Sequence, residues 1–266
     1  MTIEREWTRR LAWDGVLNAR DLGGYPAAGG RETRWGAVVR SDSLADLTAA
    51  GQSALAGYGV RTIIDLRLAD EIARHPNPFA TPGDHGVAYT NVSVIDPAAG
   101  FPPETDTLAG NYLWMLDRFD GFVAEVVTAV AGAPEGGVLI HCAAGKDRTG
   151  LISALLLGLA GVPAETIAAD YAMTAELLRP RDEAWLAAAP PEERAEREAL
   201  LARFAPRAEV MLEVLAGLEE RHGGVEGYLL EAGVSRADLD RLRQRLLAPD
   251  GGGQGPVPST GDDPPR

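Results

Sequence analysis

A single cysteine and an arginine six positions later are the two side chains in this sequence best suited to do chemistry together. Cys142 is the only cysteine among the 266 residues, and Arg148 follows it across the short sequence Ala-Ala-Gly-Lys-Asp. A thiolate is a strong nucleophile, and it forms more readily beside a helix N-terminus or beside cationic side chains. A guanidinium binds two oxygens of a phosphoryl group at once and holds them as charge redistributes in the transition state. The pair therefore predicts transfer of a phosphoryl group to the sulfur.

The residues around this pair predict a strand, a loop and a helix in direct succession. Val138–Ile140 have the length and branching of a buried strand, and the apolar run Leu151–Leu159 is long enough to require a helix. The first turn of a helix has N–H groups without partners in the chain, and these groups together with the helix dipole favour an anion. We therefore expect the loop to bind a phosphate group through Ala143, Ala144, Gly145, Lys146, Asp147 and Thr149.

Three residues of this segment have more specific expected roles. Gly145 allows the backbone to curl so that several N–H groups point into one concavity. Thr149 offers a hydroxyl to the sulfur of Cys142, and His141 is expected to fix the loop from behind through a hydrogen bond to the backbone. The alternative is a structural cysteine beside a helix-capping loop. The strand before it, the helix after it and these three residues together disfavour that alternative.

The pattern His-Cys-x-x-Gly-x-x-Arg-Thr-Gly over residues 141–150 resembles the signature of the cysteine-based protein tyrosine phosphatase superfamily. With Lys146 and Asp147 in place, it is more narrowly similar to the bacterial atypical phosphatases that act on phosphotyrosine and on phosphoinositides. A distant segment, Asn18-Ala-Arg-Asp-Leu-Gly-Gly24, is similar to a second motif of these bacterial enzymes. The resemblance extends from about Asn18 to Leu247. It implies a cysteine-phosphatase fold, a covalent phosphocysteine intermediate and neither a metal nor an organic cofactor.

Lys146 bears on the substrate that the resemblance implies. Similar phosphoinositide phosphatases also carry lysine after the signature glycine, where a second cation can meet further phosphates of the inositol ring. A lysine at this place also serves simply to solvate the surface or to stabilise the thiolate. The expected substrate is therefore a phosphorylated protein or a phosphoinositide, with inositol polyphosphate as a further alternative. A phosphate-binding pseudophosphatase without turnover is a different class, and the intact Cys142 and Arg148 count against it.

The reaction also needs a general acid opposite the sulfur, which protonates the leaving oxygen. Asp96 follows a predicted strand in a loop rich in proline and glycine, at about the position where the similar bacterial phosphatases carry a candidate acid. Asp147 is the rival. Lys146 and Arg148 flank it and favour its ionised form, which makes it a better organiser of the loop or of water than a proton donor. We therefore assign the acid to Asp96.

Two pairs of charged residues lie next to predicted strands. Arg20 and Asp21 belong to the second motif, and they either form a local ion pair beside a glycine turn or support the catalytic loop. Arg67 and Glu71 stand four positions apart at the start of a short helix. An opposite-charge pair at this spacing usually serves the scaffold, so we expect Arg67 to pair with Glu71.

Composition restricts the function classes and the compartment. The chain has 39 acidic and 25 basic side chains, and its formal net charge of −14 opposes nonspecific binding to nucleic acid or to an anionic membrane. A single cysteine excludes an internal disulfide and a thiolate zinc cluster, and the four histidines have no metal-ligand spacing. The sequence has no signal-peptide pattern and no apolar run of transmembrane length. A cytoplasmic location is expected, export without a signal peptide stays open, and the oligomeric state is not determined.

Strands alternate with helices along the chain, which predicts an α/β fold with a mostly parallel central sheet of about four or five strands flanked by helices. One phosphatase domain is expected over residues 1–247, followed by a disordered tail over 248–266 that is rich in glycine and proline. Residues 176–206 are charged and helical in pattern. Similar phosphatases carry a helical lid in this region, and a pair of solvated connecting helices is the alternative.

The individual elements follow from apolar periodicity and from turn residues. Strands are predicted at Val38–Arg40, Val60–Arg67 and Gly86–Val94. Helices are predicted at Leu44–Tyr58, Ala69–Arg74, Thr105–Asp117, Phe122–Ala131 and Pro163–Ala172. A longer helical region over 176–221 is expected to break at Pro180 and at Pro190-Pro191, and two closing helices follow, the second of them capped by Ser235.

Overall fold

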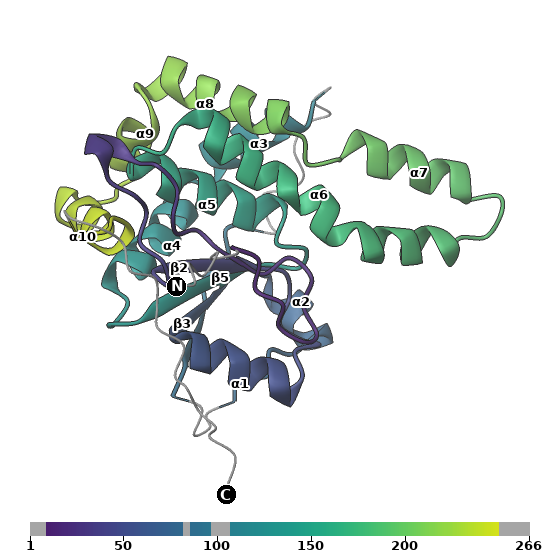
Figure 1. The fold of residues 1–266 in the computed structure, drawn as a ribbon. Coiled ribbons are helices and arrows are strands. Elements are labelled where there is room, and N and C mark those ends of the chain that lie inside the picture. The colour runs from purple at the N-terminus through teal and green to yellow at the C-terminus, as the bar shows by residue number, and fades with distance from the viewer. Residues whose placement is uncertain (1–8, 82–85, 97–106, 250–266) are drawn as a thin grey trace, which may run out of the picture.

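A computed structural model describes residues 9–81, 86–96 and 107–249 of the chain. Its centre is a five-stranded sheet in the order β1–β2–β5–β3–β4 (Figure 1). β1 runs antiparallel to β2, and all the other neighbours are parallel. The prediction of a mostly parallel sheet of four or five strands is confirmed. The strands are β1 (Arg20–Asp21), β2 (Val38–Ser41), β3 (Val60–Asp65), β4 (Ala88–Asn91) and β5 (Gly137–His141).

Ten α-helices surround this sheet in the described part of the chain. In Figure 1, α1 lies on one side of the sheet, and α4 and α5 lie on the other. The distal part of α6 and the whole of α7 project from the body as a two-helix arm. The helices are α1 (Ala49–Tyr58), α2 (Ala69–Arg74), α3 (Leu108–Arg118), α4 (Asp120–Gly132), α5 (Asp147–Leu159), α6 (Ala164–Ala187), α7 (Arg194–Arg203), α8 (Ala208–His222), α9 (Val225–Glu231) and α10 (Arg236–Leu246).

The alternation of side chains along the buried strands divides the core into two parts. Val38 and Val138 pack in a cluster with residues of α4 and α5, whereas Val39 and Leu139 pack in a second cluster with Leu55 of α1. Successive residues of a strand point to opposite faces of the sheet. Because helices cover both faces, β2 and β5 are buried along their whole length.

The helix predicted at Leu44–Tyr58 begins later than expected, at Ala49. The side-chain oxygen of Thr48 accepts a hydrogen bond of 3.2 Å from the N–H of Gly51. This N-cap satisfies a donor of the first turn and starts the helix at the next residue. The predicted end is confirmed, because Gly59 follows the helix in the left-handed conformation, with φ of 105°.

Helix α6 is longer than the sequence indicated. It runs unbroken through Ala172 and Pro180, so the predicted end and the predicted break at these residues are wrong. A proline inside a helix leaves the carbonyl four residues earlier without its N–H partner. Both Pro180 and that earlier residue, Glu176, are exposed, so water can satisfy the carbonyl. The predicted break at Pro190-Pro191 is confirmed, since α6 ends before these prolines and α7 begins after them.

The other predicted boundaries are close to the observed ones. β3 ends at Asp65 instead of Arg67, because the Asp65 carboxylate accepts a hydrogen bond from the Arg67 N–H and turns the chain. β4 is shorter than its predicted strand at both ends, α2 has the predicted bounds, and Ser235 caps α10 as predicted. The predicted helix start at Thr105, most of the loop after Asp96 and nearly all of the predicted tail lie outside the described residues. No helix in the described ranges is long and apolar enough to cross a membrane.

Candidate active site

The catalytic loop follows the central strand of the sheet, as the sequence predicted. β5 lies between β2 and β3, and α5 starts at Asp147 after the loop of residues 142–146. Gly145 has a left-handed φ of 65°, and a Cβ atom there would lie 2.4 Å from the carbonyl oxygen of Ser41 on β2. A side chain at this position would therefore push the loop off the sheet. Cys142 is only 2% exposed, at the base of the loop.

The carbonyl groups of the loop are bound by donors from the N-terminal part of the chain. The Asn18 amide donates to the carbonyl oxygens of Ala144 and Gly145, at 3.0 and 3.1 Å. Arg40 on β2 also donates to Gly145, at 2.7 Å, and the Ser43 N–H donates to Ala143, at 3.0 Å. These bonds fix the shape of the loop without using its N–H groups. Asn18 belongs to the second motif, so that motif supports the catalytic loop directly.

A buried cluster of charges holds Arg40 in place. Asp170 on α6 accepts hydrogen bonds from Arg20 Nε at 2.9 Å and from Arg40 Nη1 at 2.6 Å. Burial alone would raise the pKa of Asp170, but the charges and hydrogen bonds of the two arginines lower it well below its ordinary value. Of the two interpretations left open for Arg20, support of the catalytic loop is therefore the one that the contacts favour. The sequence analysis missed Asp170, although a carboxylate between the buried residues of an apolar helix face was a signal for it.

Asp21 does not pair with Arg20. Its carboxylate accepts hydrogen bonds from the N–H groups of Gly23, at 2.6 Å, and Gly36, at 2.7 Å, and from the hydroxyl of Tyr58. Burial raises the pKa of Asp21 to about 6, against the opposing effect of these hydrogen bonds. Asp21 thus organises the turns around β1, and of the alternatives left open, a local ion pair between Arg20 and Asp21 is not formed.

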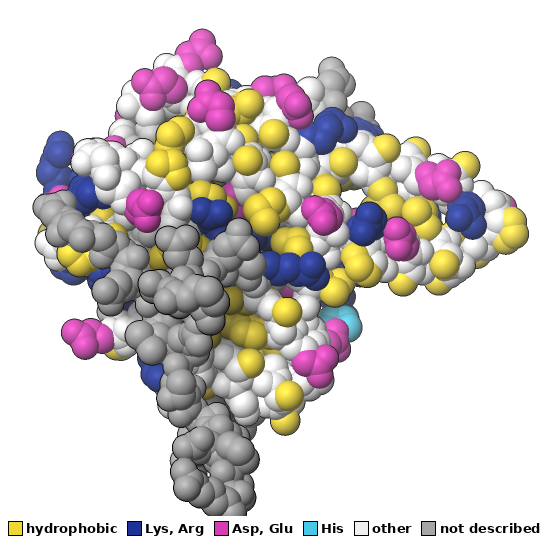
Figure 2. Space-filling model, viewed as in Figure 1, with side chains coloured by type: hydrophobic (Ala, Val, Ile, Leu, Met, Phe, Trp, Pro, Cys, Tyr) yellow, Lys and Arg dark blue, Asp and Glu magenta, His cyan; other side chains and the backbone are white. Residues whose placement is uncertain are grey.

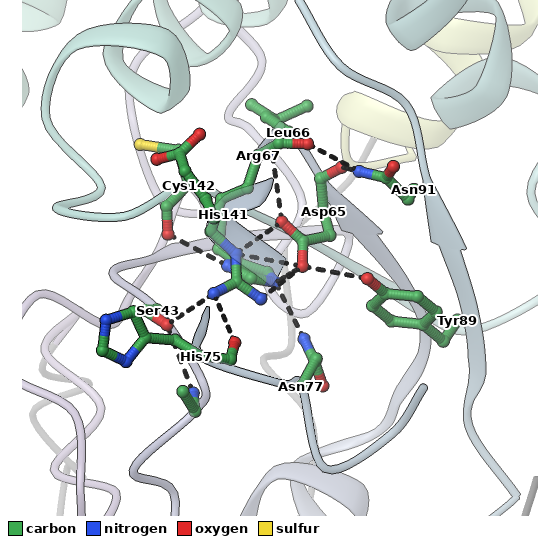
Figure 3. A network of polar contacts seen from close by, with 12 residues as sticks. Ser43, Asp65, Leu66, Arg67, His75, Asn77, Tyr89, Asn91, His141 and Cys142 are labelled. Atoms are coloured by element: carbon green, nitrogen blue, oxygen red, sulfur yellow. Dashed lines mark hydrogen bonds and ion pairs between the residues drawn. The ribbon is translucent and has the colours of Figure 1, made fainter. Parts of the chain in front are cut away.

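A second buried network lies beneath Cys142 (Figure 3). The ring of His141 contacts the Cys142 carbonyl oxygen through Nδ1, at 3.1 Å, and the Asn77 amide nitrogen through Nε2, at 3.0 Å. Because a carbonyl only accepts and an amide nitrogen only donates, the ring is neutral with its proton on Nδ1. Burial lowers the pKa of His141 to about 4, although the nearby Asp65 carboxylate opposes this shift. His141 therefore holds the loop from behind in the way that the sequence predicted.

Arg148 is paired with a carboxylate from another helix. Its guanidinium forms two hydrogen bonds with the carboxylate of Glu71 on α2, at 2.6 and 2.8 Å. The expected pair between Arg67 and Glu71 is therefore wrong. Arg67 instead binds Asp65, at 2.7 Å, because the chain turns between them and buries both side chains. The hydrogen bond from Arg148 is the main reason why the pKa of Glu71 lies below its ordinary value. Glu71 is thus a further residue of the site, and it orients the guanidinium.

Lys146 Nζ and Asp147 Oδ1 are 3.5 Å apart, and each side chain also binds a segment distant in sequence. Lys146 Nζ donates to the carbonyl oxygen of Phe204, just after α7, at 3.0 Å. Asp147 accepts a hydrogen bond of 2.5 Å from the hydroxyl of Tyr112, which is also 2.8 Å from the hydroxyl of Tyr171. The contacts of Asp147 are those of a residue that organises the loop, which agrees with the role predicted for it.

The remaining predicted residues are Thr149 and Asp96. The hydroxyl of Thr149 is buried and has no hydrogen-bond partner among the described residues, so the expected bond to the sulfur is not formed. Asp96 is half-buried on the segment that follows β4, at the border of the described residues. The structure places His141 against the carbonyl of Cys142 and connects Arg20 to the loop through Asn18. The assignment of Asp96 as the general acid stays a prediction.

A buried cysteine directly after a central parallel strand, and an arginine held in place in the first turn of the next helix, form the site expected of a cysteine-based phosphatase. A model of the tyrosine phosphatase family matches residues 11–248, and the chain belongs to this family. It is 37% identical over 230 residues to a tyrosine-protein phosphatase of Nostoc commune, with 79% of this chain and 74% of that protein covered. It is 30% identical over 278 aligned positions to the triple specificity protein phosphatase PtpB of Mycobacterium tuberculosis, with 88% and 97% covered. The resemblance in the sequence is confirmed, and the chain is a phosphatase of the Cys-x5-Arg type.

Proposed function

We propose that this phosphatase hydrolyses phosphotyrosine in proteins through a phosphocysteine intermediate. The sulfur of Cys142 attacks phosphorus, so that an S–P bond forms as the bond to the leaving oxygen breaks. Water then attacks the phosphocysteine and releases inorganic phosphate and the free thiolate. The observation that carries the proposal is the fixed loop, in which the carbonyls are bound from outside and Arg148 is oriented by Glu71 before a phosphate enters.

The leaving oxygen must receive a proton, and we assign this step to Asp96. It lies on a different segment from the loop, as a donor opposite the sulfur must. The rival Asp147 is within 3.5 Å of the ammonium group of Lys146 and accepts a bond from Tyr112. Both contacts hold the Asp147 carboxylate as part of the loop structure, which suits an organiser of the loop better than a proton donor.

Phosphoinositides are the second candidate substrate class. Lys146 supplies a second cation next to the loop, and such a cation can bind a further phosphate on the inositol ring. The similar mycobacterial protein is named for triple specificity, which is compatible with more than one class of phosphoester. Inositol polyphosphates are the third class with the same chemistry.

We also propose that residues 176–206 act as a helical lid, because Lys146 of the loop binds the backbone at the end of α7.

The test is the release of phosphate from a phosphotyrosine peptide and from short-chain phosphoinositides, measured side by side under reducing conditions. Faster release from the peptide supports phosphotyrosine as the substrate. Faster release from the lipids would make phosphoinositides the preferred substrate class. Binding of phosphopeptide without release of phosphate from any aryl phosphate would identify a pseudophosphatase instead.

A further inference from the structure

A pocket of about 240 Å³ lies between the catalytic loop and the α6–α7 arm. Its walls are mainly apolar and include Leu178 and Trp185 of α6 and Leu200 of α7. Phe204, after the end of α7, closes one side. Arg181 and Asp182 also line it, so the pocket has a charged edge and an apolar interior.

This pocket adjoins the catalytic loop at Lys146. Lys146, which belongs to the catalytic loop, forms part of its wall and donates to the Phe204 carbonyl from there. Thr174 lines it as well, and the hydroxyl of Thr174 accepts a hydrogen bond of 3.1 Å from Arg20 in the buried charge cluster. A substrate whose phosphate is bound by the loop can therefore reach this pocket with its neighbouring groups.

The arm exposes large apolar side chains that a partner would cover. Trp185 and Leu200 are each 40% exposed, and both line the pocket. The guanidinium of Arg197 lies 4.9 Å from the ring centre of Trp185 and also donates to its carbonyl at 2.9 Å, which holds the indole in one orientation. Figure 2 shows apolar side chains interspersed with charged ones along the projecting arm. Covering the two exposed side chains would remove apolar surface from water and so favour binding.

We propose that this pocket binds an apolar side chain next to the phosphotyrosine of a protein substrate. The inference rests on the proposed function and adds a sequence preference to it. A cavity of about 150 Å³ holds one benzene molecule. A pocket of about 240 Å³ therefore accommodates one large side chain, and it is too small for the two long acyl chains of a membrane lipid.

The charges of the arm also favour a peptide over a lipid surface. Residues 176–206 carry seven Asp and Glu side chains against five Arg. Binding to an anionic bilayer requires a cluster of basic side chains, and this segment has a small excess of acidic ones. The arm therefore lacks the net positive charge that binding to an anionic membrane would need.

The test compares two phosphotyrosine peptides that differ only beside the phosphotyrosine, with leucine in one and glutamine in the other. The wild type is expected to prefer the leucine peptide by roughly 10-fold in kcat/KM, mainly through KM. Leu200→Gln is expected to remove this preference, because it makes the wall polar. Met173→Gln is the matched control: Met173 is also on α6–α7 and 38% exposed, and it does not line the pocket. The control variant should keep the preference.

A second variant fills the pocket in place of changing its polarity. Ala175 is exposed and lines the pocket, so Ala175→Phe should occupy the space and also remove the preference for leucine. Hydrolysis of phenyl phosphate, which has no neighbouring group, should stay within about twofold of wild type in all three variants.

Three outcomes would overturn the inference. One is equal kcat/KM for the two peptides in the wild type. Another is an equal loss of phenyl phosphate and peptide hydrolysis in Leu200→Gln, which would place the phosphotyrosine ring itself in the pocket. The third is a preference for long-chain over short-chain phosphoinositides that Leu200→Gln abolishes, which would assign the pocket to a lipid chain. If the wild type hydrolyses no phenyl phosphate, the proposed function itself fails, and this result is separate from all three.

Discussion

Asp170 beneath the catalytic loop is 2% exposed and binds two buried arginines, whereas the ion-paired Arg194 and Glu198 on α7 have 59% and 55% of their side chains exposed. Exposed pairs of this kind contribute only about 0–1 kcal/mol, since water screens them and both side chains must be ordered. A buried charge that loses its partner costs about 3–5 kcal/mol. Ion pairs between the same types of residue therefore stabilise the region of the catalytic loop strongly, where they are buried. They contribute little to the stability of the arm, where they are exposed.

The largest expected effect is the loss of the nucleophile from the loop. Cys142→Ser should lower kcat by more than about 10³-fold, because a serine hydroxyl has no base here to ionise it. Phosphate binding should persist, since the loop and its outer hydrogen bonds remain. Kinetics with phenyl phosphate and calorimetry with inorganic phosphate measure the two properties. Residual activity within roughly tenfold of wild type would rule out the covalent mechanism.

The next largest effect concerns Asp96, which lies neither in the catalytic loop nor on the α6–α7 arm. Asp96→Asn should lower kcat on alkyl phosphates by roughly 10²–10⁴-fold, the usual contribution of a positioned acid. The loss should be far smaller on aryl phosphates with good leaving groups, and the basic limb of the pH profile should flatten. Asp147→Asn is the matched control in the loop. If it produces these changes and Asp96→Asn does not, the two residues exchange roles.

Stability offers a direct comparison of the two regions. Asp170→Asn leaves two buried arginines without a counter-charge and should reduce the free energy of unfolding by about 3–5 kcal/mol at pH 7. Glu198→Gln on the arm should reduce it by less than about 1 kcal/mol. Urea unfolding of both variants measures the difference. Similar values for the two would contradict the distinction between buried and exposed pairs.

The contribution of Asp170 to the free energy of unfolding should also decrease at low pH. The folded protein holds the pKa of this carboxyl below its ordinary value of about 3.9. The stabilisation by Asp170 is therefore complete above pH values near 3.9 and is lost as the pH falls towards the lower folded value. The difference between wild type and Asp170→Asn should shrink at pH 3. A constant difference between pH 7 and pH 3 would show that the pair is not the cause.

The smallest expected effect inside the site belongs to Glu71. Glu71→Gln keeps the shape of the side chain but weakens its bonds to Arg148, and we expect kcat to fall by roughly 10-fold. Asp70→Asn on the same helix is the control, because the Asp70 pair with Arg74 has side chains that are 67% and 63% exposed. Steady-state kinetics on a phosphotyrosine peptide separates them. Equal, small effects of both substitutions would mean that Glu71 does not orient Arg148.

Much of the catalytic loop was predictable because its signals are local. The strand, the left-handed Gly145 and the helix start lie within about a dozen consecutive residues, where periodicity and glycine conformation are informative. The contact between His141 and the Cys142 carbonyl also joins neighbours in the chain.

The residues that hold the loop were harder to predict because their partners are distant in sequence. Asp170 binds Arg20 across 150 positions, and Glu71 binds Arg148 across 77. Spacing rules favoured the near partners, Asp21 for Arg20 and Arg67 for Glu71. Burial decided otherwise: Arg20 and Arg148 bind carboxylates that the tertiary fold brings to them, and Arg67 binds Asp65. The helix was wrongly predicted to break at Pro180 for a related reason. Helix propensity does not show that the unpaired carbonyl of Glu176 is in contact with water.

The unbroken helix α6 connects the buried charge cluster at the catalytic loop rigidly to the α6–α7 arm. Asp170 and Trp185 are on the same helix, 15 residues or about 22 Å apart, so one rigid body carries both the anchor of the loop and a wall of the pocket. A swing of the arm must therefore either displace Asp170 from two buried arginines or bend the helix between them. Pro180 lies between them and already lacks one backbone hydrogen bond, which makes it the place where bending costs least. The arm is thus expected to pivot at Pro180 while the loop stays fixed.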